Sequence, residues 1–120
     1  MGKSDLKGRV APNLDPELIE FLNTYVDSFL KWELLRFFHE NPHTFDTAEG
    51  IARHIGRAPQ EVQNALLELK GRGLLKEVPV GGMLTYSLSP DPQLKARLEK
   101  FVRATDDREF RRKAIYHLVR

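Results

Sequence analysis

The sequence predicts a mainly α-helical fold with one small β-hairpin, an α+β arrangement in a single domain. Three observations lead to this fold class. Apolar residues recur with helical spacing in several separate segments. Two short helical segments are joined by a glycine-containing turn, and a Gly-Gly pair then separates two runs with strand character. The 120 residues suffice for one domain, expected at residues 14–120 after a flexible tail at residues 1–13.

The composition is that of an ordinary globular protein, with 41% hydrophobic and 30% charged residues. The sequence contains no cysteine, which excludes disulfide scaffolds, Cys-based zinc sites and thiol catalysis. No apolar run is long enough to cross a membrane, and the first residues lack the apolar core of a signal peptide. We therefore expect a cytoplasmic protein with no membrane partner.

The formal net charge of +2 conceals an uneven distribution. Residues 11–50 contain eight acidic and two basic residues, whereas residues 91–120 contain nine basic and five acidic ones. This asymmetry indicates either a basic binding face or two segments of opposite charge that meet, for example across a subunit interface. The asymmetry is explained equally well if these charges lie on solvent-exposed helix faces and their uneven distribution has no function.

An amphipathic helix is expected at the start of the domain, at residues 14–26. Asp15 is a typical N-cap residue, and Pro16 follows it at the first helical position. The apolar residues between Leu18 and Val26 then lie on one side of the helix at 100° per residue.

The next helix is expected from Asp27 to about Glu40, where apolar residues project nearly all round. Such a helix must be covered on every side. A chain of this length can hardly cover it alone, so we expect a second subunit to cover part of it. The dipeptide Asn41-Pro42 ends the helix.

Two short helices follow. Asp46 or Thr47 can cap the first of them, and Gly56 supplies the turn at its end. Pro59 opens the second, whose apolar positions continue to about Gly71.

The segments LLKEVPV and MLTYSL, separated by Gly81-Gly82, predict a β-hairpin because glycine accepts the positive φ angles of a tight turn. Pro79 fits only an edge position, since it has no N–H to donate to a ladder. After Pro92, helical apolar spacing resumes and predicts two more helices with a break near Thr105.

Residues 27–88 resemble a winged helix-turn-helix of the kind found in the MarR and ArsR repressor families. The resemblance lies in AEGIARHIG, PQEVQNALLELKGRGLLKE and GGMLTYSL, where a small-residue helix, a glycine turn, a longer helix and a hairpin follow one another. The helices at residues 14–26 and 91–120 match the dimerisation helices of such regulators by position. The resemblance implies a homodimer that binds double-stranded DNA sequence-specifically and regulates transcription, and not an enzyme.

In this fold the helix at about residues 59–71 would lie in the DNA major groove. Gln and Asn side chains can make two hydrogen bonds to adenine, and an exposed leucine can contact a thymine methyl group. Basic side chains nearby would contact phosphates and set the register. The expected base contacts are Gln60, Gln63, Asn64 and Leu67. The expected phosphate contacts are Arg53, Arg57, Lys70, Arg72 and Lys76.

Other features favour a protein partner. The tip of the hairpin, VGGM at residues 80–83, carries no basic residue. Glu61 and Glu68 place negative charge where phosphates would approach, and Leu67 is expected to be exposed. A winged-helix protein-interaction module that does not bind DNA is therefore the alternative.

The expected dimer interface combines the flanking helices with the apolar helix at residues 27–40. It is rich in aromatic side chains, namely Phe21, Phe29, Trp32, Phe37, Phe101 and Phe110. An aromatic interface leaves room for a small-molecule effector, but packing explains these residues equally well and nothing else supports such a ligand.

The segment from His39 to His43 has the H-E-x-x-H spacing of zinc peptidases, which requires both histidines on one face of a continuous helix. Pro42 lies inside the motif and ends the helix. We therefore expect no metal, cofactor or catalytic site. The absence of cysteine also argues against a thiolate metal sensor of the ArsR type.

Overall fold

The computed structural model describes residues 15–119, which form six helices and one antiparallel hairpin. In chain order the elements are α2 (Pro16–Tyr25), α3 (Phe29–Glu40), α4 (Ala48–Ile55), α5 (Pro59–Gly71), β1 (Leu75–Val80), β2 (Met83–Leu88), α6 (Pro92–Ala104) and α7 (Arg108–Val119). All the expected elements are present in the expected order, which confirms the predicted α+β fold class. The tail expected at residues 1–13 lies outside the described residues.

Side-chain caps determine where the early helices begin. The Ser28 hydroxyl accepts a hydrogen bond from the Lys31 N–H at 3.1 Å, so α3 begins two residues later than expected. Thr47, and not Asp46, caps α4 by accepting from the Gly50 N–H at 3.1 Å. These caps satisfy N–H groups that have no partner within the helix.

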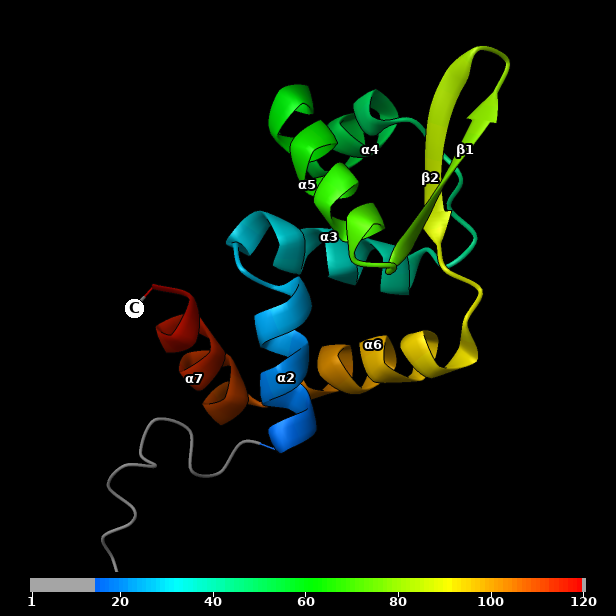
Figure 1. Cartoon of the computed structure of the whole chain (residues 1–120). Helices are drawn as coiled ribbons and strands as arrows, with labels where there is room; N and C mark the ends of the chain where they lie inside the picture. The colour runs from blue at the N-terminus through cyan, green and yellow to red at the C-terminus, as the bar shows by residue number, and fades with distance from the viewer. Residues whose placement is uncertain (1–14, 120) are drawn as a thin grey trace, which may run out of the picture.

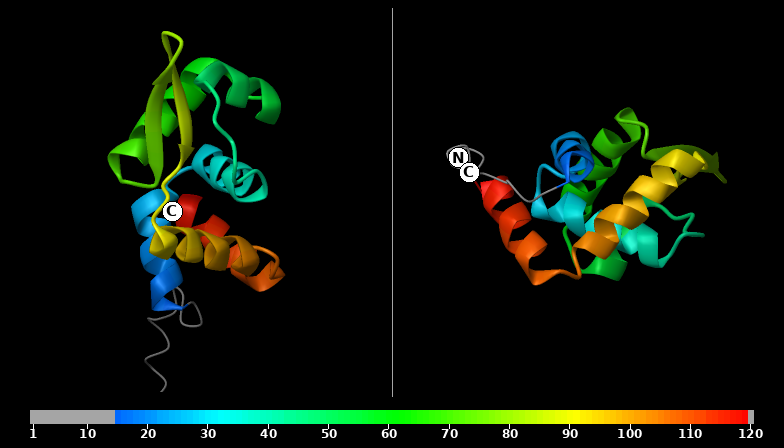
Figure 2. Two further views of the ribbon diagram at one scale, coloured as in Figure 1. Left: turned by 90° about the vertical axis from the view of Figure 1, so that its right-hand side faces the viewer. Right: turned by 90° about the horizontal axis from the view of Figure 1, so that it is seen from below.

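The elements divide between two ends of the molecule, with α3 in the middle (Figures 1 and 2). Helices α4 and α5 pack on each other and on the hairpin at one end, whereas α2, α6 and α7 lie at the other. Helix α3 contacts both α5 and α6 and therefore joins the two groups. The helix-turn-helix is thus presented on a scaffold formed by the flanking helices.

The hairpin has the two-residue turn that its sequence predicts. Val80 pairs with Met83, and between them Gly81 and Gly82 have φ angles of +57° and +82°. The sheet contains only two strands within the described chain, so Pro79 lies on an edge strand as expected.

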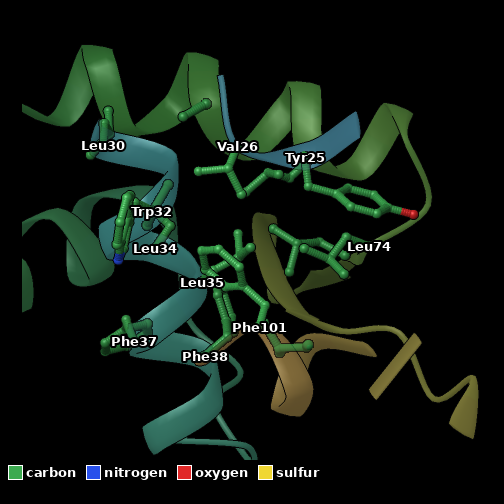
Figure 3. Packing of buried hydrophobic residues seen from close by; sticks show 14 of the residues in the cluster. Tyr25, Val26, Leu30, Trp32, Leu34, Leu35, Phe37, Phe38, Leu74 and Phe101 are labelled. Carbon is green, nitrogen blue, oxygen red and sulfur yellow. The ribbon is translucent and has the colours of Figure 1, made fainter. Parts of the chain in front are cut away.

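All the large apolar residues of α3 except Phe29 are covered by the chain itself. Trp32, Phe37 and Phe38 are buried, together with the leucines of the same helix, against residues such as Phe101 of α6 (Figure 3). Helices α5 and α6 therefore cover more of α3 than expected, and only Phe29 remains exposed among its large apolar residues. The expectation that a second subunit covers part of α3 stays a prediction.

The same burial affects the expected dimer interface. Five of the six aromatic residues assigned to it are no more than 9% exposed within this single chain: Phe21, Trp32, Phe37, Phe101 and Phe110. Phe29 differs from them because it is 47% exposed. The homodimer stays a prediction, but its interface would have to use other exposed side chains beside Phe29.

Candidate nucleic-acid interface

A tight turn sets the geometry between α4 and α5. Gly56 adopts the left-handed conformation, with φ +74°, and its N–H donates to the Ala52 carbonyl at 2.8 Å. The Arg57 N–H donates to the same carbonyl at 3.0 Å. Pro59 then occupies the first turn of α5, where its missing N–H costs no helical hydrogen bond. The two helices pack closely as a helix-turn-helix.

Helix α5 has one buried and one exposed face. Its buried residues are Val62, Ala65, Leu66 and Leu69. Gln60, Asn64 and Leu67 lie on the exposed side, and Leu67 is 41% accessible although it is apolar. The Gln60 side-chain amide donates to Asn64 Oδ1 at 3.3 Å, so the two polar side chains lie together. This orientation is the one expected from the sequence.

Gln63 faces the hairpin instead of solvent. Its side-chain N–H donates to the hydroxyl of Tyr86 on β2 at 3.1 Å, and that hydroxyl donates to Glu77 Oε2 on β1 at 2.7 Å. Lys70 completes the chain, with its ammonium 3.0 Å from Glu77 Oε1. These four side chains connect α5 to both strands of the hairpin.

Tyr86 lies at the centre of this network. The residue is fully buried, and its backbone also exchanges hydrogen bonds with Asp46, which precedes α4. Burial, followed by the contact with Glu77, raises the pKa of the Tyr86 hydroxyl. The hydrogen bond from Tyr86, with help from Lys70, lowers the pKa of Glu77. At neutral pH the hydroxyl therefore donates to a charged carboxylate.

A second network holds the opposite side of α5. Lys31 is buried in α3, and its ammonium donates to Asp27 Oδ1 at 2.7 Å and pairs with Glu68 of α5. The hydrogen bond from Lys31, with a contribution from Arg72, lowers the pKa of Asp27. The negative charge of Glu68, which the sequence placed on the flank of α5, is therefore balanced inside the molecule.

The five bases predicted to contact phosphate differ in whether they already have a partner within the chain. Arg57 pairs with Glu33 at 2.7 Å, and Lys70 pairs with Glu77. Arg72 donates to the Thr24 carbonyl at 2.8 Å and lies 3.4 Å from Asp27. Among the described residues, Arg53 and Lys76 are exposed without an ion-pair partner: these two bases remain available for an external anion.

Sequence reasoning missed the partners in these networks. Only the Asp27–Lys31 pair has a signal in the sequence, since the two residues are four positions apart in the helix expected from Asp27. Glu33 and Tyr86 lie 24 and 23 residues from the side chains that they contact. No local pattern indicates such pairs.

The end of the hairpin is exposed and apolar. Val80 and Met83 are 45% and 58% accessible, and Leu84 beside them is also exposed. A shallow hollow of about 300 Å³ lies between β2, α4 and α5, lined in part by Leu84 and Gln63. The candidate interface thus combines polar residues on α5 with an apolar hairpin tip.

His39 and His43 do not lie on one continuous helix, as the zinc peptidase motif would require. Helix α3 ends at Glu40 and Asn41 is its C-cap, so His43 lies outside the helix. Within residues 15–119 no group of three or more His, Asp or Glu side chains is placed to hold a metal ion. No helix in that part of the chain is long and apolar enough to span a membrane.

Comparison with known proteins supports the fold. The chain is similar to the solved structure of the AntR antimony-specific transcriptional repressor, with a TM-score of 0.60 and 22% sequence identity. The similarity covers 76% of this chain and 79% of that one. No protein-family model and no curated protein sequence matches the chain. The predicted winged helix-turn-helix is thereby confirmed as the fold.

Proposed function

We propose that the protein is a DNA-binding regulator of transcription that places α5 in the major groove. The observation that supports this proposal most is the exposed side of α5, where Gln60 and Asn64 lie together opposite the buried face. Both side chains can read adenine by paired hydrogen bonds, and Leu67 can contact a thymine methyl group. The structurally similar repressor is consistent with this role.

Phosphate contacts in this proposal come first from Arg53 and Lys76, since the other three bases predicted to contact phosphate have an internal partner. Lys31 balances Glu68, which removes one of the two negative charges that opposed DNA binding. Two phosphate contacts per chain imply a modest salt dependence, because each neutralised phosphate releases about one counterion.

The antimony specificity of the similar repressor is not part of the proposal. Soft metals and metalloids are held by thiolate ligands. This chain has no cysteine and cannot supply them.

A protein-interaction module is the second candidate. The exposed apolar residues Leu67, Val80, Met83 and Leu84 favour it, since apolar surface at the edge of a fold often marks a protein contact. The two candidates differ in a simple property, namely affinity for duplex DNA.

The test is binding to a random-sequence duplex at ~50 mM salt, where even non-specific binding is measurable. We expect a fluorescence-labelled duplex to be bound with a dissociation constant in the micromolar range or below, and the affinity to fall as salt rises. Undetectable binding under these conditions would overturn the proposal in favour of the protein-interaction module.

Variants on α4 and α5 test the proposed roles of individual residues in DNA binding. Asn64→Ala should reduce the preference for sites recovered from a random pool by about 1–3 kcal/mol while non-specific binding persists. Arg53→Ala should weaken binding to all sequences alike. The matched control is Arg103→Ala, which removes an exposed charge from α6 at the other end of the molecule and should leave DNA binding unchanged.

We further propose that the regulator acts in the cytoplasm as a homodimer, with its two α5 helices about one DNA turn apart. Helix α7 supplies surface for such a contact, because Ile115, Tyr116 and Val119 are all exposed although they are large and apolar. Phe29 adds a fourth exposed apolar side chain on α3. These residues replace the buried aromatic ones in the proposed interface.

Ile115→Asp is expected to convert a dimer into a monomer, because it places a charge within the apolar surface of α7. Sedimentation equilibrium at micromolar concentration measures the mass directly. Met83→Asp is the control, since it changes an equally exposed apolar residue on the hairpin and should leave the mass unaltered. A wild-type protein that sediments as a monomer would contradict the homodimer.

A further inference from the structure

The tip of the hairpin is a thin apolar projection. Val80 and Met83 pair across the two strands, so their side chains lie on the same face of the hairpin. Both are exposed, at 45% and 58%. Gly81 and Gly82 add no side chains at the turn, and nothing lies within 4 Å of the position that a Cβ atom would take at either glycine.

The projection extends past the helices beside it. In Figures 1 and 2 the turn lies beyond α4 and α5. Met83, directly after the turn, still borders the hollow beside α4. From Val78 to Thr85 the hairpin contains no charged residue. It cannot attract phosphates, and the contact that it offers is apolar.

The size of this surface decides which partner suits it. A stable protein–protein contact needs about 800 Å² from each partner, far more than two partly exposed side chains can provide. A DNA wedge needs only one or two apolar side chains, which enter between base pairs from the minor groove.

The hairpin is joined to the proposed recognition helix at the Glu77–Tyr86 pair, three residue pairs from the tip. Gln63 and Lys70 of α5 are joined through Tyr86 and Glu77 to both strands of the hairpin. A rigid connection matters, because a wedge must transmit the force that separates two bases. The tip therefore continues the surface that α5 presents to DNA.

We propose that Val80 and Met83 form an apolar wedge that enters the minor groove beside the α5 site and bends the duplex. The inference rests on the proposed DNA binding. Flexible pyrimidine–purine steps such as TA and CA/TG cost least to unstack. The wedge therefore adds a preference for such a step at a fixed distance from the bases that α5 contacts.

Ring closure of a linear duplex of ~120 bp tests the wedge, because this length is shorter than the ~150 bp persistence length and closes slowly unless a protein bends it. A random-sequence fragment is sufficient, so no operator is needed. We expect the wild-type protein to accelerate ligase-dependent closure several-fold. Val80→Thr/Met83→Thr should bind the fragment but lose most of the acceleration, and threonine preserves the strand propensity.

Leu84→Thr is the matched control. Leu84 is exposed on the same hairpin, but it points to the opposite face from Met83, the residue before it. We expect this variant to accelerate closure as the wild type does. Equal loss in Leu84→Thr and in the double variant would contradict a wedge on one face.

The outcomes separate the wedge from the proposed function. A wild-type protein that binds the fragment without accelerating closure, or a double variant that accelerates it fully, overturns the wedge and leaves DNA binding intact. Apolar contact with a protein would then be the remaining role of the tip. A wild-type protein that does not bind the fragment overturns the proposed function, and the wedge with it.

Discussion

Replacing Phe101 with alanine is expected to lower the free energy of unfolding by about 3–5 kcal/mol. Phe101 is fully buried, and its ring centroid lies 5.2 Å from that of Phe21, 5.7 Å from Trp32 and 6.1 Å from Phe110. The four rings come from α2, α3, α6 and α7, so one truncation leaves a cavity where four helices meet. Typical domains are stable by only ~5–15 kcal/mol.

Urea unfolding measures this effect, with the fluorescence of Trp32, the single tryptophan, as a probe beside the Phe101 ring. Phe45→Ala is the control, because the same side chain is removed from a position that is 54% exposed and lies outside the proposed interfaces, and it should change the stability by less than ~0.5 kcal/mol. Similar losses in the two variants would show that Phe101 is not the centre of the packing.

Most of the fold could be predicted because its signals are local. Prolines at the first helical turns, the left-handed Gly56 and the Gly81-Gly82 turn each act within a few residues. The exposed side of α5 also followed from the sequence, since Val62 marks the buried face and helical spacing places Asn64 away from it.

The predictions that failed concern contacts between residues far apart in the sequence. Periodicity showed that α3 is apolar all round, but it could not show that Phe101, more than 60 positions later, would cover Trp32. Charge counting likewise treated Arg57 and Arg72 as free, whereas Glu33 and Asp27 engage them. The sequence therefore predicted which residues face outward on α5 better than which charges remain unpaired.

Removing both acidic partners of Lys31 is the second large effect that we expect. Lys31 is 3% exposed, and its ammonium reaches Asp27 and Glu68. The double variant Asp27→Ala/Glu68→Ala leaves a buried charge without a partner, which costs about 3–5 kcal/mol in general. We expect the lower end of this range, because both carboxylates are about half exposed and water can enter the space that they vacate.

Lys31→Met is the matched control for the buried charge. Methionine retains most of the apolar stem of lysine, and both carboxylates can be solvated once the ammonium is gone. Replacing a buried ion with an apolar residue of similar volume is often neutral or stabilising. We therefore expect Lys31→Met to unfold at about the wild-type urea concentration, and the double variant at a clearly lower one.

The pH dependence gives the same prediction an independent readout. The hydrogen bond from Lys31 lowers the pKa of Asp27 below its ordinary 3.8 in the folded protein. The resulting stabilisation is complete above the unfolded pKa and is lost as the pH falls through the folded pKa. The stability difference between the wild type and Asp27→Ala should therefore be constant near neutral pH and shrink below about pH 4. A difference that is independent of pH down to pH 2 would show that the charge of Asp27 does not stabilise the fold. A Lys31→Met protein as unstable as the double variant would show that loss of the ion pairs, and not an unpaired buried charge, causes the destabilisation.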